Sequence, residues 1–260
     1  MSVWFITGIS RGLGRSLADA ALRRGHTVVG TTRSGTADLE HDRLHVLPLE
    51  LIDPSQVAPV VNRAHELAGG IDVVVNNAGF GLLGPVQDST AEQTAEVFEV
   101  NFFAPLRIIQ AAVPHLRTQG RGHLVNIASI AALDPHAGSG VYAAAKSALV
   151  AMSEALAEEL RPLGIGVTAV EPGSFRTDFL TPASIRRTGD FVSPLDAMDG
   201  KQPGDPDRAA EVIIDAVEGG RPPRHLVLGA DAIARTRENT RSLLADVDAW
   251  AAAAGNTSFG

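Results

Sequence analysis

Cysteine is absent from this chain of 260 residues. The absence excludes disulfide bonds, a thiolate nucleophile and a metal site with cysteine ligands. Basic residues are also scarce, because 22 Lys and Arg stand against 30 Asp and Glu and give a formal net charge of −8. Nucleic acids and anionic membranes are bound through a basic face, so we expect neither as a partner, although one local basic pocket is compatible with this charge.

Long apolar runs are missing as well, and none approaches the roughly 20 residues that a membrane span requires. The first residues, Met1–Thr7, lead straight into a short apolar run, without the basic segment and cleavage site of a signal peptide. The histidines His115, His123, His136 and His225 show no metal-ligand spacing. We therefore expect a cytoplasmic protein without a bound metal.

Hydrophobic residues make up 45% of the chain and charged residues 20%, which suits a large α/β domain with a sizeable core. Short runs rich in β-branched residues alternate with segments of helical pattern. The expected strands are Val3–Thr7, His26–Thr31, Leu44–Leu49, Ile71–Val75, His123–Ala128, Gly166–Val170 and Arg224–Leu228. The expected helices are Gly12–Arg24, Pro54–Ala68, Ala91–Gln119, Gly140–Leu163 and Asp205–Glu218. The alternation predicts an α/β fold, a doubly wound parallel sheet of about seven strands with helices on both faces.

One domain is expected to span residues 1–260, with a few segments that depart from the alternation. Asp178–Pro206 combines Pro, Gly and mixed charges without a period, which is typical of a lid or binding loop, and we interpret it as a substrate loop. The tail Gly255–Gly260 is small and polar, so it is expected to be frayed. Trp250, within Val247–Ala254, is interpreted as a helix packing anchor.

A glycine-rich turn with the sequence TGISRGLG, Thr7–Gly14, follows the first expected strand and opens the first expected helix. Glycines there permit a tight turn and let a phosphate approach backbone N–H groups at the helix N-terminus. The stretch Gly8–Gly12 also matches G-x-S-x-G, the nucleophile elbow of α/β-hydrolases. We reject that reading, because only seven residues precede the glycine and the elbow needs sheet already built upstream. The turn therefore predicts a dinucleotide site.

The end of the second strand indicates which nicotinamide cofactor fits. An acidic residue there would hold the ribose 2′-hydroxyl of NAD, and a basic one would accommodate the 2′-phosphate of NADP. Arg33 occupies this place, and Arg11 lies in the glycine-rich turn. Two guanidiniums suit a dianionic phosphate, whereas the alternative is a pair of solvated surface arginines. We expect NADP(H) in preference to NAD(H).

Several further motifs occur in a fixed order along most of the chain. They are NNAG at Asn76–Gly79, Asn101 in the expected fourth helical region, Ser129 placed 13 residues before Tyr142, YxxxK at Tyr142 and Lys146, and Pro172-Gly173 followed by Thr177. With the TGxxxGxG turn, this order resembles the short-chain dehydrogenase/reductase (SDR) family, whose fold is of the Rossmann type. Two positions depart from the family pattern: Glu50 stands where many members have an aspartate near the adenine, and Ala128 where a second serine is frequent.

The resemblance implies hydride transfer between a nicotinamide and a carbonyl or alcohol carbon. The catalytic residues that it implies are Asn101, Ser129, Tyr142 and Lys146. The cofactor-binding residues are Thr7, Gly8, Ser10, Arg11, Gly12, Leu13, Gly14, Arg33, Glu50, Leu51, Asn77, Ala78, Gly79, Tyr142, Lys146, Pro172, Gly173 and Thr177.

The chemistry of these residue types supports that assignment independently. Tyr142 is the only tyrosine in the chain, and Lys146 follows it on the same face of the expected helix. Reduction of a ketone leaves negative charge on its oxygen, which must receive a proton. A nearby ammonium stabilises a phenolate, so we expect Lys146 to lower the pKa of Tyr142 and also to reach the cofactor ribose. Ser129 can polarise the substrate oxygen, and the family pattern implies that Asn101 holds a water that connects Lys146 to solvent.

The substrate pocket should form above the C-terminal ends of the strands. Its candidate lining residues are Ala131, Leu133, Ser174, Phe175 and Leu180, together with Phe80, Phe179 and Phe191. Because this set is mostly apolar, we expect a hydrophobic ketone, aldehyde or alcohol. An epimerase or dehydratase on the same scaffold and a catalytically silent NADPH-binding regulator are the alternative functions.

Alanines on the helix of Tyr142 permit close packing, either against the chain's own sheet or against a second copy. In the family the same helix often forms a dimer interface. We expect a homodimer or homotetramer.

Overall fold

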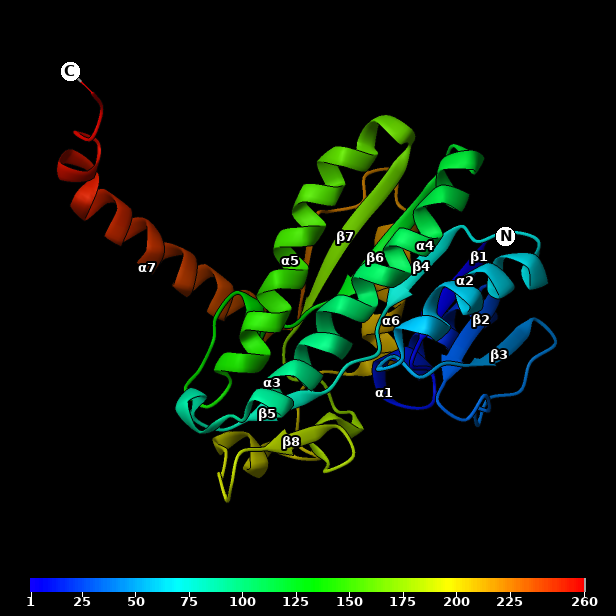
Figure 1. Ribbon diagram of the computed structural model, residues 1–260, viewed down its shortest axis with the longest axis horizontal. Helices are drawn as coiled ribbons and strands as arrows, with labels where there is room; N and C mark the ends of the chain where they lie inside the picture. The colour runs from blue at the N-terminus through cyan, green and yellow to red at the C-terminus, as the bar shows by residue number, and fades with distance from the viewer. Residues whose placement is uncertain (260) are drawn as a thin grey trace.

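Seven strands form one parallel sheet in the computed structural model, which describes residues 1–259 (Figure 1). Their order across the sheet is β3-β2-β1-β4-β6-β7-β9. Their bounds are β1 Val3–Thr7, β2 Thr27–Thr32, β3 Leu44–Pro48, β4 Val73–Asn76, β6 Gly122–Ile127, β7 Ile165–Pro172 and β9 His225–Leu228. The strand order reverses between β1 and β4, so a crevice opens at their carboxyl ends. The predicted doubly wound sheet is confirmed.

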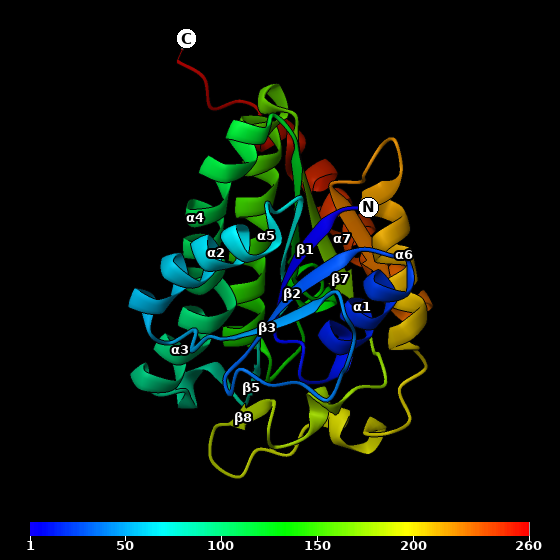
Figure 2. The same ribbon diagram turned by 90° about the vertical axis from the view of Figure 1, so that its right-hand side faces the viewer.

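Helices cover both faces of the sheet (Figure 2). α1 and α6 lie on one face, and α2, α4 and α5 lie on the other. The helix bounds are α1 Gly12–Arg23, α2 Pro54–Ala68, α3 Ala91–Phe98, α4 Ala104–Gln119, α5 Gly140–Leu160, α6 Pro206–Glu218 and α7 Ala230–Ala254. No helix among residues 1–259 is both long and apolar enough to cross a membrane.

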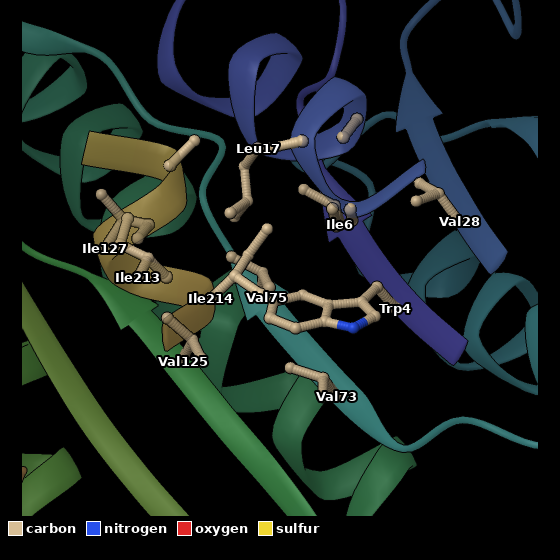
Figure 3. Close-up of a cluster of buried hydrophobic side chains, with 14 of the residues drawn as sticks. Trp4, Ile6, Leu17, Val28, Val73, Val75, Val125, Ile127, Ile213 and Ile214 are labelled. Atoms are coloured by element: carbon tan, nitrogen blue, oxygen red, sulfur yellow. The ribbon is translucent and has the colours of Figure 1, made fainter. Parts of the chain in front are cut away.

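The alternation of side chains along β1 explains why the sheet has two cores. Trp4 and Ile6 point to the α1/α6 face, where they pack with Leu17, Ile213 and other buried residues (Figure 3). Phe5 points to the opposite face and joins the cluster under α2 and α4. Burying each such side chain contributes about 1.5–3 kcal/mol. A strand buried on both sides must be continuously apolar, which is the pattern in the sequence.

The expected helix Ala91–Gln119 is interrupted, which the sequence analysis did not foresee. Between α3 and α4 lies one π-helical turn, Glu99–Phe103, labelled η2. Pro105 follows it at the start of α4 and has no N–H to donate to the carbonyl of Asn101, four residues earlier. The interruption places Asn101 in an irregular turn, and such π-turns are frequent at functional sites.

The segment Asp178–Pro206 contains more structure than its composition suggested. Within it, β8 (Ile185–Arg187) pairs in parallel with β5 (Gly81–Leu83) to form a small second sheet. Three-residue strands carry too little pattern to be recognised in a sequence. This pairing holds the segment over the crevice between β1 and β4.

The C-terminal region differs most from expectation. α7 is far longer than the helix expected around Val247–Ala254, and Trp250 is 67% exposed. The interpretation of Trp250 as a packing anchor is therefore wrong, because the last turns of α7 extend beyond the body of the molecule (Figure 1). Residues 255–259 continue without helix or strand, and Gly260 lies outside the described residues.

Candidate active site

A cavity of about 620 Å³ opens at the carboxyl ends of the central strands. Its floor is formed by the segments that follow β1, β4, β6 and β7, and its outer wall by the 178–206 segment. This is the position that a doubly wound sheet favours for a ligand.

The glycine-rich turn forms one side of this cavity. Gly8 and Gly12 have φ angles of +74° and +57°, a region that side chains with a Cβ rarely adopt. Gly14 has no room for a side chain, because a Cβ there would lie 2.2 Å from Nδ2 of Asn77 and 2.3 Å from the carbonyl oxygen of Gly8. The turn can therefore pack directly against the end of β4.

Hydrogen bonds fix the turn to the segment after β4. Asn77 Nδ2 donates to the carbonyl of Thr7 at 2.8 Å. The Thr7 hydroxyl oxygen accepts the backbone N–H groups of Asn77 and Ala78, both at 3.0 Å. Thr7 is thus buried behind the cavity, where it shapes the walls without lining them.

Gly14→Ala is expected to destabilise the protein by about 1–3 kcal/mol, because the added methyl group must displace Asn77 or the Gly8 carbonyl. Urea unfolding followed by circular dichroism measures the change in the free energy of unfolding. Gly220→Ala is the matched control, since a Cβ at Gly220 meets no atom within 4 Å. Equal stability of the two variants would contradict the packing described for the turn.

α5 presents Tyr142 and Lys146 to the cavity, one turn apart. Both side chains are largely buried, with residue exposures of 7% and 4%. The Tyr142 hydroxyl lies near the side chain of Ser129, which follows β6. Lys146 Nζ donates to the carbonyl oxygen of Ile127 at 2.8 Å. The end of β6 therefore positions both polar groups of α5, and the serine and the phenol face the same space.

Asn101 lies deeper, behind Gly79, and is fully buried. Its Nδ2 donates to the carbonyl of Phe80 at 2.9 Å. A Cβ on Gly79 would lie 2.5 Å from Asn101 Oδ1 and 3.3 Å from Lys146 Nζ, so the asparagine and the lysine meet across this glycine. Asn101 Oδ1 has no hydrogen-bond partner among the described residues. A buried acceptor beside a buried amine is a suitable place for an ordered water.

Burial changes the pKa values of both α5 residues. It raises the pKa of Tyr142 to about 12, and the neighbouring Ser129 side chain opposes this rise. It lowers the pKa of Lys146 to about 7. Without a bound ligand the phenol is therefore protonated and the amine is partly neutral near pH 7. The expectation that Lys146 lowers the pKa of Tyr142 does not hold for the ligand-free site, because burial of the phenol dominates there.

A family model described as short chain dehydrogenase matches residues 2–187. The chain belongs to the short-chain dehydrogenase family. Relatives agree along the whole length: an oxidoreductase named BOA17 from Botryotinia fuckeliana is 31% identical, and the match covers 95% of this chain and 96% of that protein.

Two solved structures resemble this short-chain dehydrogenase closely. The crystal structure of a short-chain dehydrogenase from Streptomyces avermitilis has a TM-score of 0.92 at 34% identity and covers 99% of this chain and 98% of its own. That of a short chain dehydrogenase from Burkholderia cenocepacia in complex with NADP has a TM-score of 0.77 at 27% identity and covers 96% of each chain. The family makes this protein an oxidoreductase.

Most of the site residues expected from the sequence line the one cavity of the short-chain dehydrogenase. These are Gly8, Ser10, Arg11, Gly12, Leu13, Gly14, Arg33, Glu50, Leu51, Asn77, Ala78, Gly79, Ser129, Ala131, Tyr142, Lys146, Pro172, Gly173, Ser174, Phe175, Thr177 and Leu180. Thr7 and Asn101 lie just behind it.

Leu133 and Phe191 are the exceptions among the expected lining residues, because both lie outside the cavity lining. The ring of Phe191 lies beside Gly138 instead, so the expectation for Phe191 is wrong. The carbonyl oxygen of Leu133 accepts a hydrogen bond from Asn239 of α7. The short 3-10 turn Ile130–Ala132 (η3) turns the chain away from the cavity after Ala131. The expectation for Leu133 is therefore wrong.

Part of the outer wall consists of residues that the sequence pattern did not indicate. Ile185, Leu195 and Met198 line the cavity from β8 and from the 3-10 turn Pro194–Met198 (η6). No periodic signal marks these residues, and only the apolar character of a long irregular loop could have suggested them.

Arg11 makes a contact that its motif did not predict. Its Nη2 donates to the carbonyl of Ala183 at 3.0 Å and to the hydroxyl of Ser184 at 2.9 Å. The guanidinium thus connects the glycine-rich turn to the 178–206 segment. In this conformation Arg33, exposed at the end of β2, is the arginine with the freer access to a ligand.

Proposed function

We propose that the protein is an NADP(H)-dependent oxidoreductase that interconverts a carbonyl and a secondary alcohol on a hydrophobic substrate. The observation that carries this proposal is the buried Tyr142 phenol, with Ser129 beside it and Lys146 one turn away, in the cavity that the glycine-rich turn borders. Neither a metal ligand set nor a nucleophile is needed for this chemistry.

The shape of the cavity supports a dinucleotide. The turn from Gly8 to Gly14 brings backbone N–H groups at the N-terminus of α1 to its wall, where a pyrophosphate would be held. Pro172, which ends β7, and Gly173 and Thr177, which follow it, would contact the nicotinamide end. Glu50 and Leu51, after β3, would contact the adenine end. When bound, the nicotinamide supplies or accepts the hydride.

In the reduction, the Ser129 hydroxyl donates a hydrogen bond to the substrate carbonyl oxygen and polarises it. As a hydride reaches the carbonyl carbon, the oxygen gains the electron pair of the π bond and takes the proton of the Tyr142 hydroxyl. The resulting phenolate is stabilised by protonated Lys146 and regains its proton from solvent. We assign this relay to Lys146 and to a water at Asn101, whose unpartnered Oδ1 supports such a position. Oxidation of an alcohol runs the same steps in reverse.

Burial gives Lys146 a pKa suited to this relay. A lysine with a pKa of about 7 can both carry and release a proton near neutral pH, whereas an ordinary lysine is fixed in the charged form.

The preference for NADP(H) rests on Arg33. It lies at the end of β2 on the cavity wall, and the chain places no acid there to hold a ribose 2′-hydroxyl. The NADP complex of the relative from Burkholderia cenocepacia supports the assignment.

Arg33→Asp is expected to lower kcat/KM for NADPH by about 10- to 100-fold, because a charge-assisted contact with the 2′-phosphate is replaced by repulsion. The value for NADH should stay equal or rise, since a carboxylate can accept from the ribose hydroxyl. Arg221→Asp, with the same charge change in the loop before β9, is the control. A wild-type preference for NADH would refute the assignment of Arg33.

Apolar side chains along the outer wall support a hydrophobic substrate. Phe179, whose ring centroid is 5.9 Å from that of Tyr142, covers the phenol, and Leu180 and Ile185 continue the surface. Consumption of NADPH with a panel of aliphatic and aromatic ketones and aldehydes tests the function as a whole. Binding of NADPH without turnover on any of them would favour a regulator that binds the cofactor only.

A homo-oligomer stays part of the proposal. On α5, Ala143 and Ala145 are buried in the chain itself, whereas Ala144 and Ala151 are exposed. The exposed small residues leave a face on which a second copy can pack closely.

A further inference from the structure

The last five turns of α7 have no neighbour within the chain that buries them. The first turns are fixed to the body, where Arg235 forms an ion pair with Asp134 at 2.7 Å and Asn239 donates to the carbonyl of Leu133. Every residue from 237 to 254 is exposed. Figure 1 shows the helix leaving the body beside α5 and continuing into open space.

This exposed part of α7 carries an apolar stripe. Leu243, Leu244, Val247 and Trp250 are 55–67% exposed, and their spacing of three and four residues places them on one side of the helix. Ala251 and Ala254 extend the stripe to the end of the helix. We call these six residues the α7 stripe.

The exposed apolar area of the α7 stripe and the stability of an isolated helix both indicate that a partner covers the stripe. Four large side chains form a patch on the order of several hundred Å², the size at which exposed apolar surface marks an interaction site. A helix gains most of its stability from packing of its apolar face, so an unsupported helical arm is marginal in water. The heptad-like spacing of the α7 stripe is the pattern of a helix that packs along another helix.

Charges on α7 favour a second copy in the antiparallel direction. The basic residues Arg237 and Arg241 precede Leu243 and Leu244, with Glu238 between them in an ion pair with Arg241 at 2.7 Å, and the acidic residues Asp246 and Asp248 follow. Two copies in parallel would place arginines beside arginines and aspartates beside aspartates. Antiparallel copies place the arginines of one helix beside the aspartates of the other, which lowers the energy of the pair. The same acidic residues disfavour an anionic membrane as the occupant.

We propose that α7 is a dimerisation arm, in which two copies of α7 pack as an antiparallel helix pair around a two-fold axis near Leu243 and Leu244, so that the rest of each α7 stripe lies along the earlier turns of the other helix. In this register Leu243 of one copy faces Leu244 of the other, and Arg237 and Arg241 flank the other copy's Asp248. The dimerisation arm is a different surface from the exposed face of α5. If each surface joins two copies of the chain, the two surfaces together would link four copies.

Single cysteines test the register, because the chain has no cysteine of its own. Leu244→Cys places two thiols near the two-fold axis, so mild oxidation should yield a covalent dimer on a non-reducing gel. Ala254→Cys places the thiols at opposite ends of the pair and should stay uncrosslinked. Crosslinking of Ala254→Cys without Leu244→Cys would show a parallel pair and overturn the proposed arrangement.

Mass measurement by light scattering after gel filtration tests the arm itself. The double variant Leu243→Glu/Leu244→Glu should have half the assembled mass of the wild type. Ala245→Glu, which adds a charge on the opposite side of α7, should keep the wild-type mass. An unchanged mass for the double variant, or a wild-type chain that is monomeric and floats with lipid vesicles, would overturn the proposal.

An exchange of charged residues between the two helices tests their antiparallel direction independently of the cysteine crosslinks. Asp248→Arg should weaken the dimer, and addition of Arg237→Asp should restore it, which an assembly through another face would not show. Quenching of tryptophan fluorescence provides the readout on dilution, because Trp4 is fully buried and only Trp250 can change its exposure.

Discussion

Replacement of Tyr142 by Phe is expected to lower kcat by roughly 10³-fold, the scale of a lost general acid–base group. Tyr142 is the only tyrosine of the chain, and it lines the cavity together with Ser129. Removal of this oxygen leaves the developing alkoxide without a proton donor. The measurement is steady-state turnover with NADPH and a ketone that the wild type reduces.

Binding of NADPH should change little in Tyr142→Phe, because the phenylalanine ring fills the same space and keeps its contact with Phe179. Fluorescence titration gives the Kd, and circular dichroism confirms that the variant is folded. A variant that retains a tenth or more of the wild-type kcat would rule out Tyr142 as the proton donor.

Lys146→Met has two expected effects, one on turnover and one on stability. Turnover should fall by about 10²- to 10³-fold, because the phenolate loses its stabilising cation and the proton relay loses its amine. Stability should change with pH. Burial holds the pKa of Lys146 near 7, against 10.5 for an ordinary lysine.

The sign of the pH effect follows from proton binding. Between these two pKa values the unfolded chain binds the lysine proton and the folded chain does not, so the free energy of unfolding of the wild type rises with pH. The contribution is up to about 1.4 kcal/mol per pH unit from one proton. Below pH 7 both states bind the proton and the full penalty for burying the amine remains.

Urea unfolding of wild type and Lys146→Met at pH 6, 8 and 9.5 measures this difference. The wild type should gain stability relative to the variant as the pH rises above 7. Lys201, the second lysine of the chain, is exposed, so Lys201→Met should keep both the turnover of the wild type and its rise of stability with pH. If the free energies of unfolding of wild type and Lys146→Met changed with pH in the same way, the pKa of Lys146 could not be strongly lowered in the folded protein.

Local residue patterns were enough to predict the sheet and much of the cavity lining from the sequence. The buried strands are continuously apolar, and the glycine-rich turn follows the first of them, so both could be located from single segments. Spacing also placed Tyr142 and Lys146 on one face of a helix. The interruption before α4 could not be located this way, although Pro105 offered a signal, because a proline in the first turn of a helix is also unremarkable.

Contacts between distant segments account for what the sequence did not reveal. The pairing of β8 with β5 and the reach of Arg11 to Ser184 join residues more than 100 positions apart. The pKa of Tyr142 depends on how deeply α5 is buried, which residue spacing does not encode. Trp250 fits a packing pattern, and only the position of α7 outside the body reveals that any partner must come from elsewhere.

Transfer of deuterium is the most direct test of the central claim, that this cavity moves a hydride between a nicotinamide and a carbonyl carbon. The protein is incubated with NADPH deuterated at the transferring position of the nicotinamide and with a ketone that it consumes, and the product is examined by mass spectrometry. One deuterium is expected on the carbinol carbon for each NADPH oxidised, and Tyr142→Phe should form roughly 10³-fold less of this labelled product in the same time. Product that carries no deuterium from NADPH, or that acquires it only from deuterated solvent, would contradict the account and indicate an epimerase or a dehydratase.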